Sequence, residues 1–388
     1  MLANDNRSGR LRISSPSAAC LLKQAGIDPI MQPGCRNRNR IALLGDLPDA
    51  GVTAWRPATT LLAALVFTTW LGEAPLADEL YDYYASGDPA DVTTATRALV
   101  VMQGGGDDVD MNYVRMGEAA GGGDFVVLRA SGDAAYNDYI YALCRCNSVE
   151  TIVLKSREAS SEAFVIDKIR NAEAIFLAGG DQSNYVRYWK GTAVEDAINH
   201  VSAKPAPIGG TSAGMAILGQ FSYSAMSPES LTAKAALEDP YNDNLTIEAD
   251  FLEIDGLQGI ITDQHVLERD RIGRTVALLA RLVHDGLAMP ARAIAADRET
   301  AVHLDPVSGE ITVHATGSHE TPYAYFLRTT SQPEVCEPDR PLVIAGIEVV
   351  RVGPGGRFNV RSWHGNDGIR YTLSAADGQL DSSRDDVY

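Results

Sequence analysis

The stretch "APIGGTSAGMAIL" (206–218) links a short apolar run to a helix-like run through a turn of small residues. Small side chains in succession add little to a packed core. Glycines on both sides of Ser212, however, carry no side chain that could collide with neighbouring backbone in a sharp turn that exposes the hydroxyl. The segment "GTSAG" (210–214) fits the G-x-S-x-G pattern, in which a nucleophilic serine lies on a sharp strand-to-helix turn. Small-residue turns also occur in packed sheets, so the position after a strand carries weight. The stretch predicts an α/β fold and a nucleophilic Ser212.

Strand-like and helix-like stretches alternate on both sides of this turn. Runs of consecutive apolar residues, rather than in–out alternation, indicate a parallel sheet that is covered on both faces. Helical stretches are expected at 157–171 and 183–203. The predicted strands lie at 97–102, 125–128, 151–154, 174–182, 206–208, 259–262 and 292–297.

The character of the sequence changes towards both ends. After residue 300, short alternating runs between turn residues predict antiparallel hairpins at the sheet edge and a small C-terminal β-rich region. The chain therefore divides into a leader (1–95), a catalytic domain (96–332) and a β-rich extension (333–388).

The leader contains a candidate export signal at 56–77. Arg56 precedes an apolar core at 61–71, which is too short to span a bilayer but suits a secretory signal. Ala74 and Ala77 follow as small residues near a cleavage site. A buried N-terminal helix, which would leave the protein cytoplasmic, is the alternative. The signal predicts a secreted or periplasmic protein with no membrane segment in its mature form.

Composition and cysteine usage narrow the classes of partner. The 388 residues are 45% hydrophobic, which is enough for a sizeable core, and the formal net charge is −18. This charge argues against nucleic acid or an anionic membrane and favours cationic or zwitterionic ligands. Outside the leader, Cys144 and Cys146 are too close in sequence to pair easily, and Cys336 stands apart. No zinc-type spacing is present, so we expect no metal and no cofactor.

Four predicted strands end in conspicuous residues. They run into the glycines at 104–106, the "GGDQ" turn at 179–182, the serine turn, and "DQH" at 263–265. Because ligands bind at the carboxyl ends of parallel strands, we expect these segments to converge. The glycines at 104–106 lack the spacing of a dinucleotide fingerprint, and we interpret them as a tight turn where backbone approaches the site.

A serine hydroxyl needs a base, and His265 is the candidate because it follows a predicted strand at the same edge. A lone histidine is more often structural, so the shared edge is what supports this assignment. The amide of Ala213, at the start of a helix, is placed to stabilise an oxyanion, with the amide of Gly180 as a second donor. Gln182 would face the substrate. Alternatively, the 179–182 turn is an ordinary helix start capped by Asp181.

Three arginines follow His265. Arg269, Arg271 and Arg274 either form a solvated helix face that pairs with Glu268 and Asp270, or hold a substrate carboxylate by bidentate contacts.

Together these segments resemble the S51 serine peptidases, which include cyanophycinase and the aspartyl dipeptidase called peptidase E. The resemblance rests on "GGDQ", "GGTSAG", "DQH" followed by R-x-R-x-x-R, and a later "D-x-x-TA", and covers roughly 97–330. It implies a flavodoxin-like, three-layer sheet similar to class I glutamine amidotransferases, in a homodimer. It also implies acyl transfer in which Ser212 attacks, His265 moves the proton, and Gly180 and Ala213 hold the oxyanion.

The arginine spacing is more similar to cyanophycinases than to peptidase E. Cyanophycinases cleave cyanophycin, a poly-aspartate whose side chains carry arginine, and release β-Asp-Arg dipeptides. Similar enzymes with an export signal and a C-terminal β-rich extension occur in bacteria. The resemblance implies a peptide substrate with Asp and Arg character. The residues it assigns to the aspartate-derived part are Gln182, Asp263, Gln264, Arg269, Arg271 and Arg274.

One position departs from the resemblance. Cyanophycinases carry "DExTA", whose Glu orients the histidine, whereas this chain has "DRETA" with Arg298 at that position. Asp297 and Glu299 are the neighbouring carboxylates, although on an extended strand both would point away from the face of residue 298. We assign the orienting carboxylate to Glu299.

Other functions remain open from the sequence. The chain could be a dipeptidase similar to peptidase E, or a catalytically impaired binding homologue, as Arg298 suggests. It could also be an α/β-hydrolase esterase, a fold that orders its triad Ser, acid, His. In that case the base would be one of the late histidines: His303, His314, His319 or His364.

Overall fold

The computed structural model describes residues 80–227, 229–317 and 322–388. The predicted signal at 56–77 and His319 lie outside the described residues. None of the helices within the described ranges is long and apolar enough to cross a membrane. The boundary of the leader at residue 95 is wrong, because Tyr81–Gly87 forms strand β1, which pairs antiparallel with the whole of β4.

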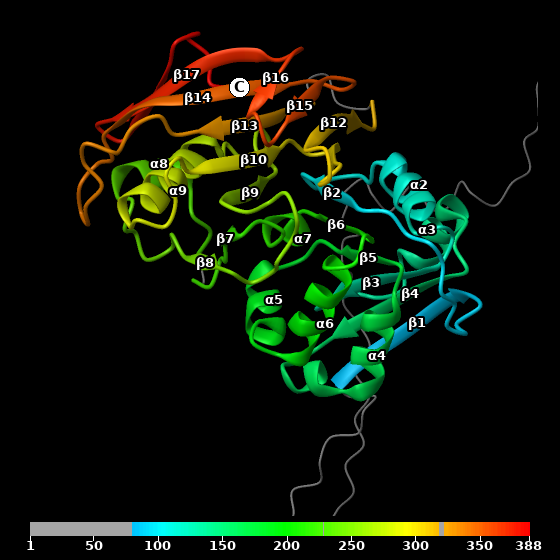
Figure 1. The fold of residues 1–388 in the computed structure, drawn as a ribbon. Coiled ribbons are helices and arrows are strands. Elements are labelled where there is room, and N and C mark those ends of the chain that lie inside the picture. The colour runs from blue at the N-terminus through cyan, green and yellow to red at the C-terminus, as the bar shows by residue number, and fades with distance from the viewer. Residues whose placement is uncertain (1–79, 228, 318–321) are drawn as a thin grey trace, which may run out of the picture. The chain divides into compact units, whose positions relative to one another are not determined.

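The first sheet is built around five parallel strands whose carboxyl ends share one edge (Figure 1). In spatial order the sheet runs β1-β4-β3-β5-β6-β2-β11-β12-β15-β16. The five parallel strands are β2 (Leu99–Gln103), β3 (Asp124–Arg129), β4 (Ser148–Leu154), β5 (Ala174–Leu177) and β6 (Pro207–Thr211).

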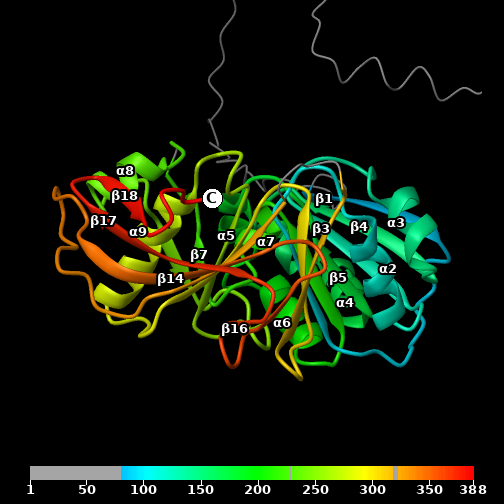
Figure 2. The ribbon, with the colours of Figure 1, turned by 90° about the horizontal axis from the view of Figure 1, so that it is seen from above.

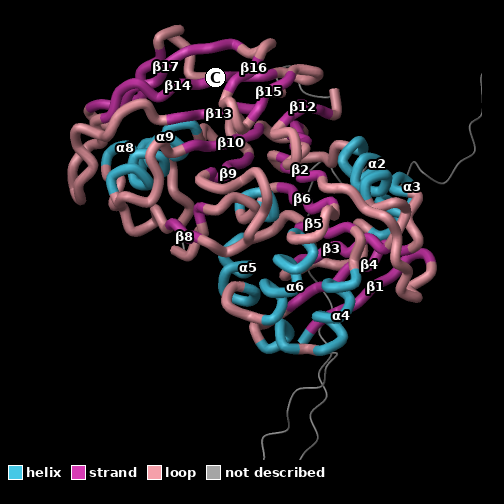
Figure 3. Tube along the Cα trace, viewed as in Figure 1, coloured by secondary structure: helices cyan, strands magenta, loops and turns pink. Residues whose placement is uncertain are grey.

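Helices cover both faces of this parallel region, as the continuous apolar strands require. On one face α2 (Asp110–Ala119) and α3 (Asn137–Cys144) bury Tyr113 and Ile140 against the strands. The other face is covered by η2 (Glu158–Ser161), α4 (Ala163–Asn171), α5 (Gln182–Trp189) and α6 (Ala193–Ser202). Figure 3 shows the two helical layers on either side of the strands.

The strands predicted at 259–262 and 292–297 do not extend the first sheet, which corrects the sequence-based arrangement. They are β9 (Ile260–Gln264) and β10 (Arg292–Ala296), which pair in parallel in a second sheet. The physical reason is that β6 already has β5 and β2 on its two edges, and the free edge of β2 is taken by β11 (Thr300–Leu304). The second sheet runs β18-β17-β14-β13-β10-β9-β7-β8.

The remaining strands belong to both sheets. The antiparallel pairing expected after residue 300 is confirmed. The extension at 333–388 is not a separate layer, because its strands continue both sheets (Figure 2). The bounds are β7 (Phe221–Tyr223), β8 (Ile247–Ala249), β12 (Glu310–Ala315), β13 (Ala324–Arg328), β14 (Ile344–Val352), β15 (Arg357–Asn359), β16 (His364–Gly365), β17 (Ile369–Ala376) and β18 (Gln379–Ser382).

Each face of the second sheet packs differently. The helices α8 (Ala233–Glu238) and α9 (Ile272–His284) cover one face with an apolar cluster. The other face packs Ile294 and Phe326 into the same core as the first sheet. A mixed α/β fold is therefore confirmed, and its two sheets meet along a shared core.

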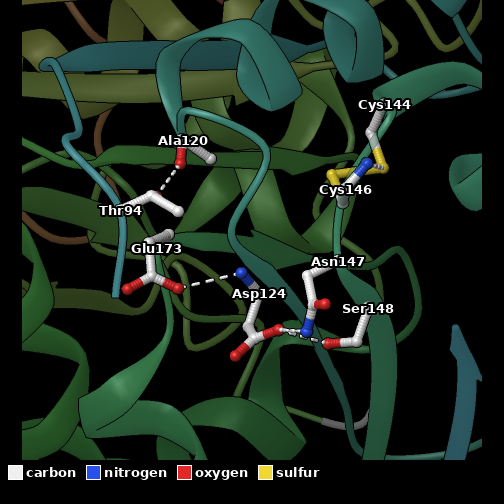
Figure 4. Close-up of a disulfide and its surroundings, with 8 residues drawn as sticks. All are labelled: Thr94, Ala120, Asp124, Cys144, Cys146, Asn147, Ser148 and Glu173. Atoms are coloured by element: carbon white, nitrogen blue, oxygen red, sulfur yellow. Dashed lines mark hydrogen bonds between the residues drawn. A yellow bond between two sulfur atoms is a disulfide. The ribbon is translucent and has the colours of Figure 1, made fainter. Parts of the chain in front are cut away.

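The structure joins Cys144 and Cys146 by a disulfide, although their proximity in sequence argued against pairing (Figure 4). Arg145 between them has a left-handed backbone, which brings the two Cα atoms to 5.2 Å. Beside the disulfide, Asp124 accepts hydrogen bonds from Asn147 Nδ2 and Ser148 Oγ, both at 2.8 Å. This cluster joins the amino ends of β3 and β4, which is the end of these strands opposite to the serine turn.

Candidate active site

The serine turn and the end of β9 meet although they belong to different sheets. Ser212 Oγ lies 3.0 Å from His265 Nε2. Ser212 directly follows β6, and His265 directly follows β9. The sequence predicted that these strand ends would converge as neighbours within one sheet. In the structure they converge from two different sheets. The late histidines that the structure describes, His303, His314 and His364, contact other groups. For example, His303 Nε2 lies 2.7 Å from Asn112 Oδ1.

The local backbone explains the residues around Ser212. Its φ of 51° and ψ of −115° form a strained turn before the short helix α7 (Ala213–Ala216). A Cβ on Gly210 would lie 2.6 Å from the carbonyl carbon of Gly214, and one on Gly214 would lie 2.6 Å from that of Leu177. Side chains at either position would therefore push the turn apart. The amide of Ser212 donates to the carbonyl of Gln103 at 3.0 Å, which ties the turn to β2.

The glycine turn after β2 supports the imidazole of His265. His265 has a φ of 49°, and its amide donates to the carbonyl of Gly104 at 2.9 Å. Gly105 has a φ of 97°, and a Cβ there would overlap the ring, 2.5 Å from His265 Cε1. The expected close approach of this turn to the site is therefore confirmed.

We expect Gly105→Ala to lower kcat by about 10²-fold, because displacing a catalytic group by about 1 Å has an effect of this size. The alanine also has to adopt a φ of 97°, which strains the turn. The measurement is kcat beside the thermal unfolding midpoint. Gly286→Ala is the matched control, since Gly286 also has positive φ (72°) but no heavy atom within 4 Å of the place where its methyl group would lie. An active, stable Gly105→Ala would contradict the support of His265 by this turn.

The carboxylate on the other ring nitrogen is Glu268, which corrects the assignment to Glu299. Glu268 Oε2 lies 2.6 Å from His265 Nδ1. Because Nδ1 carries a single hydrogen, this contact uses it, and Nε2 is left to accept the hydroxyl proton of Ser212. Glu299 pairs with Arg298 at 2.7 Å and accepts a hydrogen bond from Thr316 Oγ1 at 3.3 Å.

Asp297, the other carboxylate considered from the sequence, stabilises the loop that carries His265. It is buried, and its Oδ1 accepts the amide of Leu267 at 2.9 Å, within the loop that carries His265 and Glu268. Its Oδ2 accepts the amide of Tyr323 at 3.0 Å and the hydroxyl of Tyr325 at 3.2 Å. Asp297 thus fixes the histidine loop to β13.

Burial and neighbouring charges set the protonation of the pair. Burial lowers the pKa of His265 below its ordinary value, and Arg269 and Arg271 act in the same direction, while the hydrogen bond and charge of Glu268 oppose them. Burial alone would raise the pKa of Glu268, but the hydrogen bond from His265 and the charges of His265 and Arg298 leave it below its ordinary value. At neutral pH the site therefore holds a neutral imidazole beside an ionised carboxylate, which suits a general base.

Two of the residues expected to bind substrate are enclosed. Asp263 and Arg274 form a buried ion pair, with Arg274 Nε 3.2 Å from Asp263 Oδ2. Thr275 Oγ1 also donates to Asp263 at 2.9 Å, and the guanidinium of Arg274 lies 4.6 Å from the ring centroid of Tyr223. Burial raises the pKa of Asp263, but Arg274 and Arg271 outweigh it and keep this pKa below its ordinary value. These side chains hold β9 against α9.

The other expected substrate residues differ in their exposure. Arg271 is buried and donates to the carbonyl of Gln264 at 2.9 Å and to its side-chain oxygen. Burial and the charge of Arg274 lower the pKa of Arg271 to about 10. Gln182 Nε2 donates to the carbonyl of Tyr223 at 3.3 Å. Arg269, by contrast, is exposed beside Glu268.

The two expected oxyanion donors lie in the turns around Ser212. A Cβ on Gly179 would lie 3.5 Å from Ser212 Cβ, so the turn that carries Gly180 approaches the nucleophile. Among the described residues, the amides of Gly180 and Ala213 donate to no protein acceptor. Free amides beside a nucleophile suit an oxyanion site. In the described ranges, no group of three or more His, Cys, Asp or Glu side chains is arranged to hold a metal ion.

Sequence reasoning missed two residues of the site. Glu268 stands three residues after His265, and this spacing is the signal that a local turn could bring them together. Gln103 is buried, accepts the amide of Val109 and Asn112 Nδ2, and presents its carbonyl to Ser212. Nothing in the sequence around Gln103 distinguishes it from an ordinary strand end.

Comparison with known proteins identifies part of the chain. Residues 130–237 match the model of peptidase family S51. A solved structure of a peptidase from an acI-B1 Actinobacterium is similar with a TM-score of 0.45 and 12% identity, over 68% of this chain and 98% of that one. The solved structure of a putative peptidase E protein from Listeria monocytogenes EGD-e is similar with a TM-score of 0.37 and 13% identity, over 57% of this chain and 99% of that one. The curated proteins give no match.

The family match includes the 179–182 turn and the serine turn, while His265 lies beyond it. The prediction of an enzyme is confirmed, since the chain is a serine-type peptidase. Its residues 130–237 are similar to peptidase family S51.

Proposed function

We propose that this chain is a serine exopeptidase that hydrolyses cyanophycin to β-Asp-Arg dipeptides through an acyl-enzyme. The observation that carries the proposal is the 3.0 Å contact between Ser212 Oγ and His265 Nε2, with Glu268 on the opposite ring nitrogen. This is the arrangement of a nucleophile, a base and an orienting carboxylate. The strained backbone at Ser212 and His265 further supports a catalytic role over a binding role, because strain collects at functional sites.

The reaction uses these groups in sequence. Ser212 Oγ attacks the scissile carbonyl carbon while its proton passes to His265 Nε2, and Glu268 holds the proton on Nδ1. The amides of Gly180 and Ala213 stabilise the oxyanion that forms. Collapse of the tetrahedral intermediate breaks the C–N bond, and the leaving amine takes the proton from Nε2. Water then releases the acyl group by the same steps, which restores the Ser212 hydroxyl.

Charges around Ser212 support a substrate with both a carboxylate and a guanidinium. Arg269 is exposed next to Glu268, so its guanidinium is available to bind a carboxylate, whereas Arg298 is paired with Glu299. Exposed Asp107 and Asp181 follow the glycines at 104–106 and at 179–180, and their carboxylates can accept a guanidinium. A β-Asp-Arg unit carries both kinds of group.

A substrate panel tests the proposal. Purified protein is incubated with insoluble cyanophycin and, separately, with Asp-Leu and isoaspartyl-Leu dipeptides, and the products are identified by mass. We expect β-Asp-Arg from the polymer, with kcat/KM on its soluble oligomers about 10²-fold or more above that on the dipeptides, which offer no arginine.

Cleavage of the dipeptides without release from the polymer would overturn the substrate assignment in favour of an activity similar to peptidase E. If the protein turned over none of these substrates, it would be a catalytically impaired homologue. Export from the cell, proposed from the 56–77 segment, would bring the enzyme to polymer outside the cell.

A further inference from the structure

Arginines gather around the turn at 361–364, far along the sequence from the serine turn. Three hollows of about 440, 300 and 370 Å³ share residues of this turn. Ser362 and His364 line the first two, and Arg361 lines the last two. The arginines that line these hollows, here named the arginine surface, are Arg292, Arg328, Arg357, Arg361 and Arg370.

Most of this charge is not neutralised. Within the described residues, Arg328 is the one arginine of the surface that forms an ion pair, with Glu348. Arg361 Nη2 donates to the carbonyl of Pro306 at 3.0 Å, and Arg370 Nη2 donates to the carbonyl of Gly365. A carbonyl acceptor fixes a guanidinium in place but leaves its charge available to a ligand. Within the described residues, the other four arginines of the surface form no ion pair, although the chain has a net charge of −18.

Two buried donors beside these hollows lack partners. The guanidinium of Arg292 lies 5.1 Å from the ring centroid of Trp363, and Arg292 Nε is buried without an acceptor. Trp363 lines the largest hollow, and its Nε1 is likewise buried without an acceptor. Burial, together with the charge of Arg328, lowers the pKa of Arg292. Arg292 lines the hollow of about 370 Å³ and Trp363 the hollow of about 440 Å³, so the two side chains form part of the wall between these hollows and the core.

We propose that the arginine surface binds carboxylates of the polymeric substrate and holds the enzyme on it while Ser212 cleaves. This inference rests on the proposed function. The guanidinium fork suits a carboxylate, and the net charge of −18 disfavours a nucleic acid as occupant. Each repeat of arginine-substituted poly-aspartate presents one carboxylate and one guanidinium. Glu310 and Asp255 each line one of these hollows and can accept the guanidinium.

The surface is separate from the chemistry. None of the side chains that line its three hollows is Ser212, His265, Glu268 or a residue in direct contact with them. Binding of long polymer and hydrolysis of short substrate are therefore separable by substitution.

The test combines Arg357→Gln, Arg361→Gln and Arg370→Gln, three exposed positions, with glutamine retaining hydrogen-bonding capacity. In a Ser212→Ala background, which prevents turnover, we expect the fraction retained on insoluble cyanophycin and the affinity for soluble poly-L-aspartate to fall about tenfold or more. With Ser212 present, kcat/KM on a β-Asp-Arg tetramer (two repeats) should stay within twofold. The control variant combines Arg97→Gln, Arg115→Gln and Arg340→Gln, which remove the same number of positive charges outside the arginine surface. These three arginines pair with Glu118 or Glu337.

Each outcome decides the proposal. Unchanged retention in the triple variant, or equal loss in the control, would overturn it. Binding of inorganic polyphosphate at the surface without binding of poly-L-aspartate would also overturn the carboxylate assignment. If the wild-type protein hydrolyses no polymer, the proposed function fails, but poly-L-aspartate affinity still reports on the surface. The single variant Arg357→Gln, together with thermal unfolding, separates lost binding from lost folding.

Discussion

Replacement of Ser212 by alanine is expected to lower kcat by roughly 10⁶-fold, which corresponds to about 8 kcal/mol of transition-state stabilisation. The hydroxyl lies 3.0 Å from His265 Nε2, and no other hydroxyl is found at this distance from that nitrogen in the described residues. His265→Ala should cause a loss of similar size, and the double variant should lose little more, because nucleophile and base act as a unit. Release of β-Asp-Arg and single-turnover rates measure these losses.

The control for this prediction is His364→Ala assayed on soluble oligomers. His364 is an exposed late histidine, and in the alternative fold it could have been the base. We expect its activity to equal that of the parent. Loss of activity in His364→Ala together with retention of activity in His265→Ala would contradict the assignment of His265 as the base for Ser212. That result would favour the esterase interpretation.

Residues at strand ends were predictable because the signal is local. The apolar run, the glycines and Ser212 lie within a few residues, and the need for glycine in this turn follows from the close backbone approach of Gly210 and Gly214. The position of His265 followed from the same rule. Its strand lies in the second sheet, which the sequence does not reveal, because buried strands of either sheet are equally apolar. Sheet membership depends on which strand edges are already occupied.

The orienting carboxylate was not predictable because it depends on irregular backbone. The alternation argument assumed an extended strand through 297–299, whereas residues 298 and 299 form a turn and Glu299 has a φ of 58°. Similarly, residues 266–270 form turns rather than a regular helix, and positive φ at His265 and Asp270 folds Glu268 back onto the ring. The disulfide escaped prediction for a related reason, since the left-handed Arg145 reverses the chain between its cysteines.

Glu268→Gln is expected to lower kcat by about 10³-fold. Loss of a fully buried orienting carboxylate lowers kcat about 10⁴-fold in other serine enzymes, and the side chain of Glu268 is 36% exposed, which moderates the effect. Glutamine preserves the shape but can present its NH₂ to Nδ1, which favours the tautomer that cannot accept the proton of Ser212. The direct measurement is kcat for oligomer hydrolysis across a range of pH.

The pH profile distinguishes positioning of His265 by Glu268 from a merely structural loss. Glu268 raises the pKa of His265 against the effect of burial, so its removal should lower that pKa. Since the base is active when neutral, the acid limb of kcat/KM should move to lower pH while the plateau falls. Glu299→Gln is the matched comparison, because Glu299 pairs with Arg298, and we expect it to leave the acid limb in place. A greater loss in Glu299→Gln, with a shifted limb, would restore Glu299 as the orienting carboxylate.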